Sequence, residues 1–158
     1  MASAASLLTA VIVVIATLVL APPAQTARKR VVGCTHAYWK HHRDAWQQIA
    51  PQHSFGAVFD GAGGRVARLT MLEALRARGG RGVEGAERTL ARAAAAAWLN
   101  AAHDDVDYPW SHTGFGEGGR PGLVNAVNVA FTNGDRATML ALAGWLDHDS
   151  NRTECPLD

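Results

Sequence analysis

The sequence predicts a single all-α domain of about five helices, arranged as a small bundle or an orthogonal array. Strand signals are nearly absent, because Ile49 is the only isoleucine after residue 30 and the valines rarely alternate with polar residues. Helix signals recur instead: capping residues precede apolar side chains at helical spacing, and clusters of glycine separate these runs. Cys34 and Cys155 stand at the two ends of the domain, and in an exported protein we expect them to form one disulfide that ties its termini together.

The first predicted helix begins after Thr35, a good capping residue, and ends near residue 50, because Pro51 follows. Residues 51–65 are predicted to form a loop, in which Phe55 and Phe59 fold back onto the core. The apolar face of the helix consists of three residues at helical spacing: Trp39, Trp46 and Ile49.

Two further helices are predicted in the middle of the chain. Thr70 and Glu73 form a capping-box pattern at the start of one helix, which closes at Gly79 and Gly80. The next helix is the longest and runs from about Gly85 to Ala102. Alanine has the highest helix propensity, and its small side chain lets a neighbouring helix approach closely. This helix contains five consecutive alanines, 93–97.

Two more helices are predicted after a polar loop at residues 103–119. Pro121 suits the first position of a helix, which Asn133 and Gly134 would end. Asp135 is then the expected N-cap of the last helix.

The first 30 residues have the composition of a signal peptide. Val11 to Leu20 is an unbroken apolar run, too short for a membrane span, and small residues follow it. The basic residues 28–30 lie after the apolar run, which leaves open a dibasic processing site or an uncleaved anchor. We expect cleavage, a secreted protein, and a mature domain at residues 31–158 without a membrane span.

The charge of that domain argues against a nucleic-acid partner. The chain has 15 basic and 14 acidic side chains, and residues 1–30 contain three of the basic ones and no acid, so 12 basic and 14 acidic remain. A net charge of −2 with no basic run lacks the electrostatic footprint that nucleic acids require.

Four segments of the chain resemble a class of exported proteins. CTHAYWKHH at 34–42 resembles the CTPGYWKNH opening of that class, and TMLEAL at 70–75 resembles its TLLEAL helix start. LARAAAAAWLNAAHDDVDYP at 90–109 is similar to its long alanine-rich helix, which ends in NAAHPDVDYP, and the tail ECPLD is similar to its closing CPL. The resemblance implies an exported helical domain with paired first and last cysteines, often a module of surface or matrix proteins. It implies no particular activity.

Seven histidines raise the question of a metal site. His36, Ala37 and His41 depart from the motif of the resembled class and place two extra imidazoles near His42. Adjacent histidines point about 100° apart on a helix, and no HxxxH pair is present in this segment, so we predict no metal site and no cofactor. We also predict no catalytic residue.

A second polar cluster lies just past the longest helix. His103 and the acids that follow it, including Asp105 and Asp107, could form a calcium loop or an acid–base pair. We favour a structural role, in which Tyr38, Trp39 and His42 pack against residues 104–109 and Lys40 lies close to one of the acids. The predicted motif core therefore has eight members: Tyr38, Trp39, Lys40, His42, His103, Asp105, Asp107 and Tyr108.

The function that these features favour is that of an exported structural or interaction module, which associates with itself or with other surface proteins. The expected interface consists of Trp110 and Phe115 in the polar loop, together with the small apolar face of Ala91 and residues 93–97. Asn151 begins a glycosylation sequon. The alternatives are a secreted enzyme at His103 and its acids, or a metal-binding protein that uses the histidines.

Overall fold

The fold is all-α, as predicted. The computed structural model describes residues 33–111, 118–151 and 154–158. The predicted leader 1–30, Phe115, and Arg152 and Thr153 of the sequon lie outside the described residues. The described residues contain no strand, only a single bridge between Ser54 and Thr70. Their six α-helices are α1 (His36–His41), α2 (Phe55–Val58), α3 (Met71–Arg76), α4 (Gly82–Ala102), α5 (Gly119–Asn133) and α6 (Arg136–Ser150).

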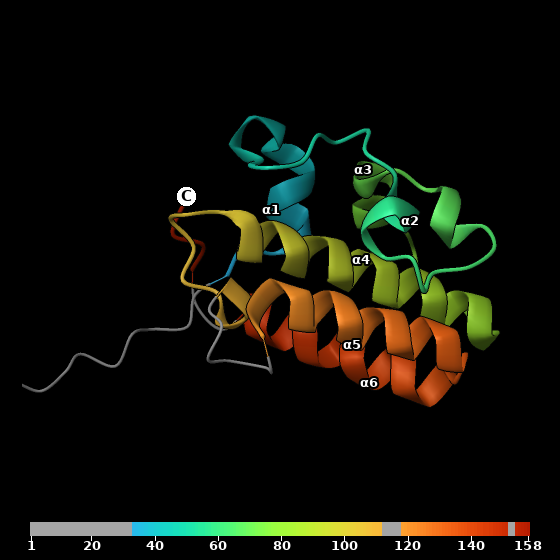
Figure 1. Cartoon of the computed structure of the whole chain (residues 1–158). Helices are drawn as coiled ribbons and strands as arrows, with labels where there is room; N and C mark the ends of the chain where they lie inside the picture. Colours follow the sequence, from blue (N-terminus) through green and yellow to red (C-terminus); the bar gives the residue numbers. More distant parts are fainter. Residues whose placement is uncertain (1–32, 112–117, 152–153) are drawn as a thin grey trace, which may run out of the picture.

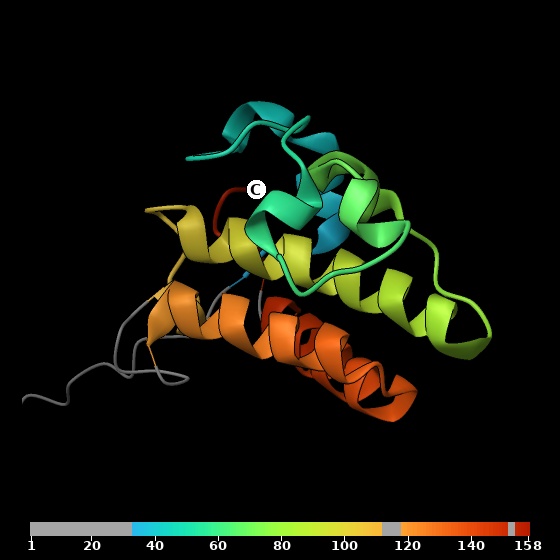
Figure 2. The ribbon, with the colours of Figure 1, turned by 45° about the vertical axis from the view of Figure 1, so that its right-hand side comes forward.

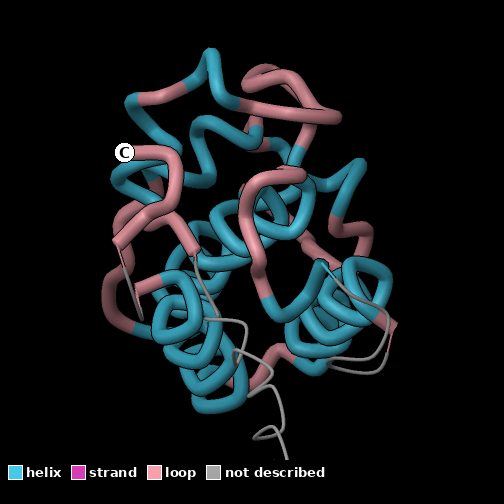
Figure 3. Tube along the Cα trace, turned by 90° about the vertical axis from the view of Figure 1, so that its left-hand side faces the viewer, coloured by secondary structure: helices cyan, strands magenta, loops and turns pink. Residues whose placement is uncertain are grey.

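Helix α4 is the centre of the molecule. In Figures 1 and 2, α5 and α6 run beside it on one side, and α1, α2 and α3 lie on the other. The colours of Figure 1 show that α5 runs in the opposite direction to α4 and α6, so the three long helices form an antiparallel bundle. Figure 3 looks nearly along these helices, with the short helices of the N-terminal half covering one side. The fold is therefore a bundle with one added layer.

The first helix is shorter than predicted, and the indole of Trp46 binds a carbonyl that a continuing helix would use. It ends at His41 instead of near residue 50, and a 3₁₀ turn follows at Arg43–Ala45. The indole Nε1 of Trp46 donates a hydrogen bond of 2.9 Å to the carbonyl of Trp39. The backbone N–H of His42 donates to the carbonyl of Tyr38 at 3.0 Å, which closes the last turn. Local spacing therefore overestimated the length of this helix.

Local capping signals were more reliable. Thr70 and Glu73 form the predicted capping box at the start of α3, and Asp135 caps α6 by accepting the backbone N–H of Thr138. Phe55 and Phe59 are fully buried, as predicted. The short helix α2 lies within the segment 51–65 that was predicted as a loop.

The alanines of α4 are buried within the domain, which contradicts the predicted interface. Ala91 and residues 93–97 are at most 1% exposed, because helices cover α4 on both sides. Trp110 is also wrong as an exposed interface residue: it is 8% exposed and lies in the 3₁₀ helix Pro109–Ser111, which packs against α4 and α5. Any surface for association must lie elsewhere.

Candidate functional site

The predicted disulfide is present and joins the two ends of the domain. Cys34 and Cys155 are bonded, with 4.6 Å between their Cα atoms and a sequence separation of 121 residues. Cys34 is fully buried beside the C-terminal part of α4.

Asn100 of α4 connects this disulfide to the motif core, and sequence reasoning did not single it out. It is fully buried, and its Oδ1 accepts the backbone N–H of Cys34 at 2.7 Å and the indole N–H of Trp39 at 3.0 Å. Its Nδ2 donates to the carbonyl of Cys34 at 2.9 Å and to Oγ of Ser150 at 3.2 Å. All four hydrogen-bonding positions of the amide are therefore satisfied. The sequence signal for its role is that Asn100 is a polar residue among the apolar neighbours of the long helix.

The aromatic members of the predicted motif core are distributed around Asn100. The ring of Trp39 lies 5.9 Å from that of His103. Tyr38 stacks on His42 at 4.1 Å, and its hydroxyl donates to the carbonyl of Leu157 in the C-terminal tail. Tyr108 is fully buried and its hydroxyl donates to the carbonyl of Leu146 in α6, and burial raises its pKa.

Lys40 makes no ion pair with Asp104 or Asp105 in the described part of the chain. Its charge instead contributes to the lowered pKa of His36, which lies on the same face of α1, behind the larger effects of desolvation and of Arg92. The predicted proximity of Lys40 to one of the acids of residues 104–109 stays a prediction. Arg92 of α4 and Asp147 of α6 both interact electrostatically with His36. Nη2 of Arg92 lies 3.9 Å from Oδ2 of Asp147, and burial raises the pKa of Asp147.

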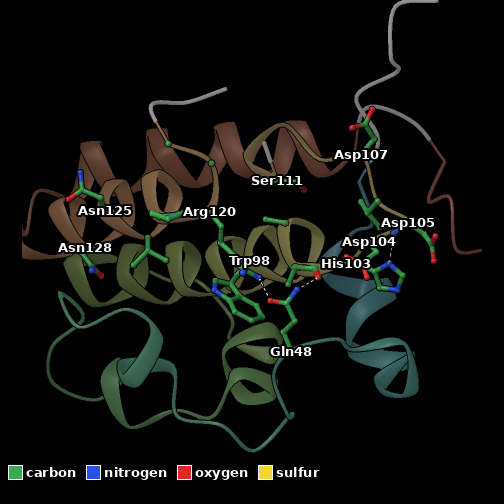
Figure 4. Close-up of a pocket in the computed structure, with 17 residues that line it drawn as sticks. Gln48, Trp98, His103, Asp104, Asp105, Asp107, Ser111, Arg120, Asn125 and Asn128 are labelled. Carbon is green, nitrogen blue, oxygen red and sulfur yellow. Dashed lines mark hydrogen bonds between the residues drawn. The ribbon is translucent and has the colours of Figure 1, made fainter. Parts of the chain in front are cut away.

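His103 and the acids after it line a groove of about 960 Å³ (Figure 4). Three separate segments form it: the loop at Gln48, the end of α4 with the chain that follows it, and the start of α5. Figure 4 shows Asn125 and Asn128 at one end, and His103 and Asp105 at the other.

A side-chain network spans the middle of the groove. The guanidinium carbon of Arg120 lies 5.2 Å from the centre of the Trp98 ring, and Nη1 of Arg120 donates to Oε1 of Gln48 at 2.5 Å. Nε2 of Gln48 donates to the carbonyl of Ala102, in the last turn of α4. Gln48 has a φ of 62°, in the left-handed region that non-glycine residues seldom adopt. Such backbone strain is concentrated at functional sites.

The histidine in this groove has a defined hydrogen-bonding role. Nδ1 of His103 accepts the backbone N–H of Asp105 at 3.2 Å, and its Nε2 lies 3.5 Å from the side-chain nitrogen of Gln47. No group of three or more histidine, cysteine, aspartate or glutamate side chains is assembled for a metal ion within the described ranges.

No helix among the described residues is long and apolar enough to cross a membrane.

A further feature lies on the outer side of the bundle. Trp145 of α6 is 67% exposed, and it was not among the predicted interface residues. Next to it, a Cβ added at Gly144 would meet nothing within 4 Å.

Comparison of the chain with models of protein families, with curated proteins and with solved structures finds no match.

Proposed function

We propose that this protein is an exported structural or interaction module of a cell surface, extracellular matrix or filament, and that it acts by association with further copies of itself. The observation that carries the proposal is the exposure of Trp145. A tryptophan side chain buries about 200 Å², so covering its exposed two thirds contributes on the order of 3 kcal/mol per copy.

The surface around Trp145 has the composition of an interface. Beyond Arg136 in the first turn of α6, no exposed residue of the helix is acidic, lysine or arginine, and the half-buried Asp149, one turn after Trp145, is the charged neighbour on this face. Depletion of charge around an aromatic residue is typical of the centre of an interface. The exposed residues of α6 beyond its first position are Ala137, Thr138, Ala141, Gly144, Trp145 and His148, and we call them the α6 outer stripe.

The α6 outer stripe also suits pairing with an identical surface. It contains a projecting side chain, Trp145, directly beside a position without a side chain, Gly144. In a two-fold contact the same patch is used on both copies, so a projection and a gap must lie on one surface. We therefore place Trp145 of each copy against Gly144 of the other.

Export is supported by independent features of the chain. Disulfides such as Cys34–Cys155 persist in oxidising compartments outside the cytosol. The apolar run at 11–20 and the small residues after it have the pattern of a signal peptide. The resemblance of residues 34–42 and 90–109 to a class of exported surface proteins agrees with this proposal.

Analytical ultracentrifugation of the disulfide-bonded protein over a wide concentration range tests the association. We expect a species of at least twice the monomer mass, which Trp145→Ser and Gly144→Gln each shift back to monomer. Gly144→Gln improves helix propensity and meets no clash in the single domain, so its melting temperature should not fall.

Val83→Ser is the matched control, because Val83 is a 44% exposed apolar residue at the start of α4, outside the α6 outer stripe. Its sedimentation should equal that of the unaltered protein. A strict monomer at every concentration, or an oligomer that both α6 variants retain, would contradict the proposal.

A further inference from the structure

The groove at the end of α4 is a second surface that the proposed association does not use. Its volume of about 960 Å³ lies within the range of small-molecule sites in proteins. The strained backbone of Gln48 and the contacts of Arg120 hold its three segments together, although Gln48 and Arg120 are 72 residues apart in the chain. The tertiary contacts of the fold therefore determine the shape of the groove.

The charges of the groove argue against an ionic ligand. The acids Asp104, Asp105 and Asp107 lie at one end and disfavour an anion such as a phosphate or a carboxylate. Arg120 occupies the middle, over the ring of Trp98, and disfavours a cation there. A ligand that extends from the acids to Arg120 meets charges of both signs, which suits a neutral molecule better than an ion of either sign.

Two exposed polar groups in the groove have unused hydrogen-bonding capacity. In the part of the chain that the structure describes, the side-chain amide of Asn125 and the carboxylate of Asp104 have no hydrogen-bond partner. Together they offer both donors and acceptors. Between them lie apolar surfaces of Ala101 and Val124.

We infer that the groove binds a neutral carbohydrate. Sugars present hydroxyl groups, each of which donates and accepts a hydrogen bond, beside apolar C–H faces, and the lining of the groove likewise combines polar groups with apolar surface. These polar groups are spread from Asn125 at one end to Asp104 at the other (Figure 4), so the ligand is an oligosaccharide chain.

A printed array of neutral, sulfated and uronic-acid glycans, probed with the full disulfide-bonded protein, tests this inference. We expect binding to neutral glycans, and the best-bound oligosaccharide is then titrated by calorimetry. Asn125→Ala and Arg120→Ala should each weaken its affinity at least tenfold. Asn125 is exposed, so its substitution leaves the fold intact even where Arg120→Ala does not.

Asn133→Ala and Arg136→Ala are matched controls, because both residues are exposed and lie outside the groove. They should bind as the unaltered protein does, and so should Trp145→Ser, which separates this inference from the proposed association. Binding of no neutral glycan overturns the inference. Preference for anionic glycans or for spermine overturns it, and so does binding that Asn125→Ala leaves unchanged.

Discussion

Replacement of Asn100 by alanine should cause one of the largest losses of stability in this domain. The substitution removes the partner of the Cys34 N–H, the Cys34 carbonyl and the Trp39 indole N–H, which are held at 2.7, 2.9 and 3.0 Å. A buried polar group without a partner costs about 1–3 kcal/mol. Three such groups give a range of about 3–9 kcal/mol, and entry of water into the vacated space favours its lower half. We therefore expect a loss of about 3–6 kcal/mol.

Urea unfolding of the disulfide-bonded protein, followed by circular dichroism, measures this loss. Asn125→Ala is the control, since Asn125 is exposed on α5, and it should change the free energy of unfolding by about 0.5 kcal/mol or less. Trp39→Phe deletes the indole donor and part of a fully buried ring but leaves both hydrogen bonds between Asn100 and Cys34, so it should cost less than Asn100→Ala. In the double variant the two losses should not add, because both remove the same hydrogen bond. A loss below about 1 kcal/mol for Asn100→Ala would refute the reasoning.

Three other perturbations follow from local geometry. Replacing both cysteines by serine should lower the free energy of unfolding by about 4–5 kcal/mol in chemical denaturation, because the disulfide closes a loop with a separation of 121 residues; an unchanged midpoint would argue against it. Gly85→Ala should lower the melting temperature despite the better helix propensity of alanine, since the new Cβ would overlap the backbone of Gly80; a rise would show that residues 79–82 move aside freely. Hydrogen bonds from Thr138 lower the pKa of Asp135 in the folded state, so its stabilising effect is present above its unfolded pKa and is lost as the pH falls through the folded value. Asp135→Asn should therefore lose less stability than the unaltered protein between about pH 4 and pH 2, as thermal melts would show.

Features set by neighbours in the chain were predictable from the sequence. The caps at Thr70 and Asp135 depend on contacts three residues away, and both form as expected. The positions of α4, α5 and α6 were predicted to within a few residues, because each long helix has a sustained apolar stripe and a clear end signal.

Features set by distant segments were not predictable. The alanine run correctly predicted a helix, but one helix alone does not reveal that others cover both of its sides. The role of Asn100 depends on Cys34 and Trp39, which lie more than 60 residues away in the chain. For the candidate site, His103, Asp105 and Asp107 were named in advance, whereas Gln48, Trp98 and Arg120 join them only through the fold.

The position of the disulfide has a mechanical consequence. Cys34 and Cys155 lie 4.6 Å apart at their Cα atoms, and the 120 residues between them form a closed loop outside the direct covalent path. A pulling force applied to the chain before Cys34 and after Cys155 passes through the sulfur–sulfur bond, and the helices bear none of it. Within a surface layer or a fibre under tension, the domain would transmit load as a short inextensible link. Its length under force would increase only after chemical reduction.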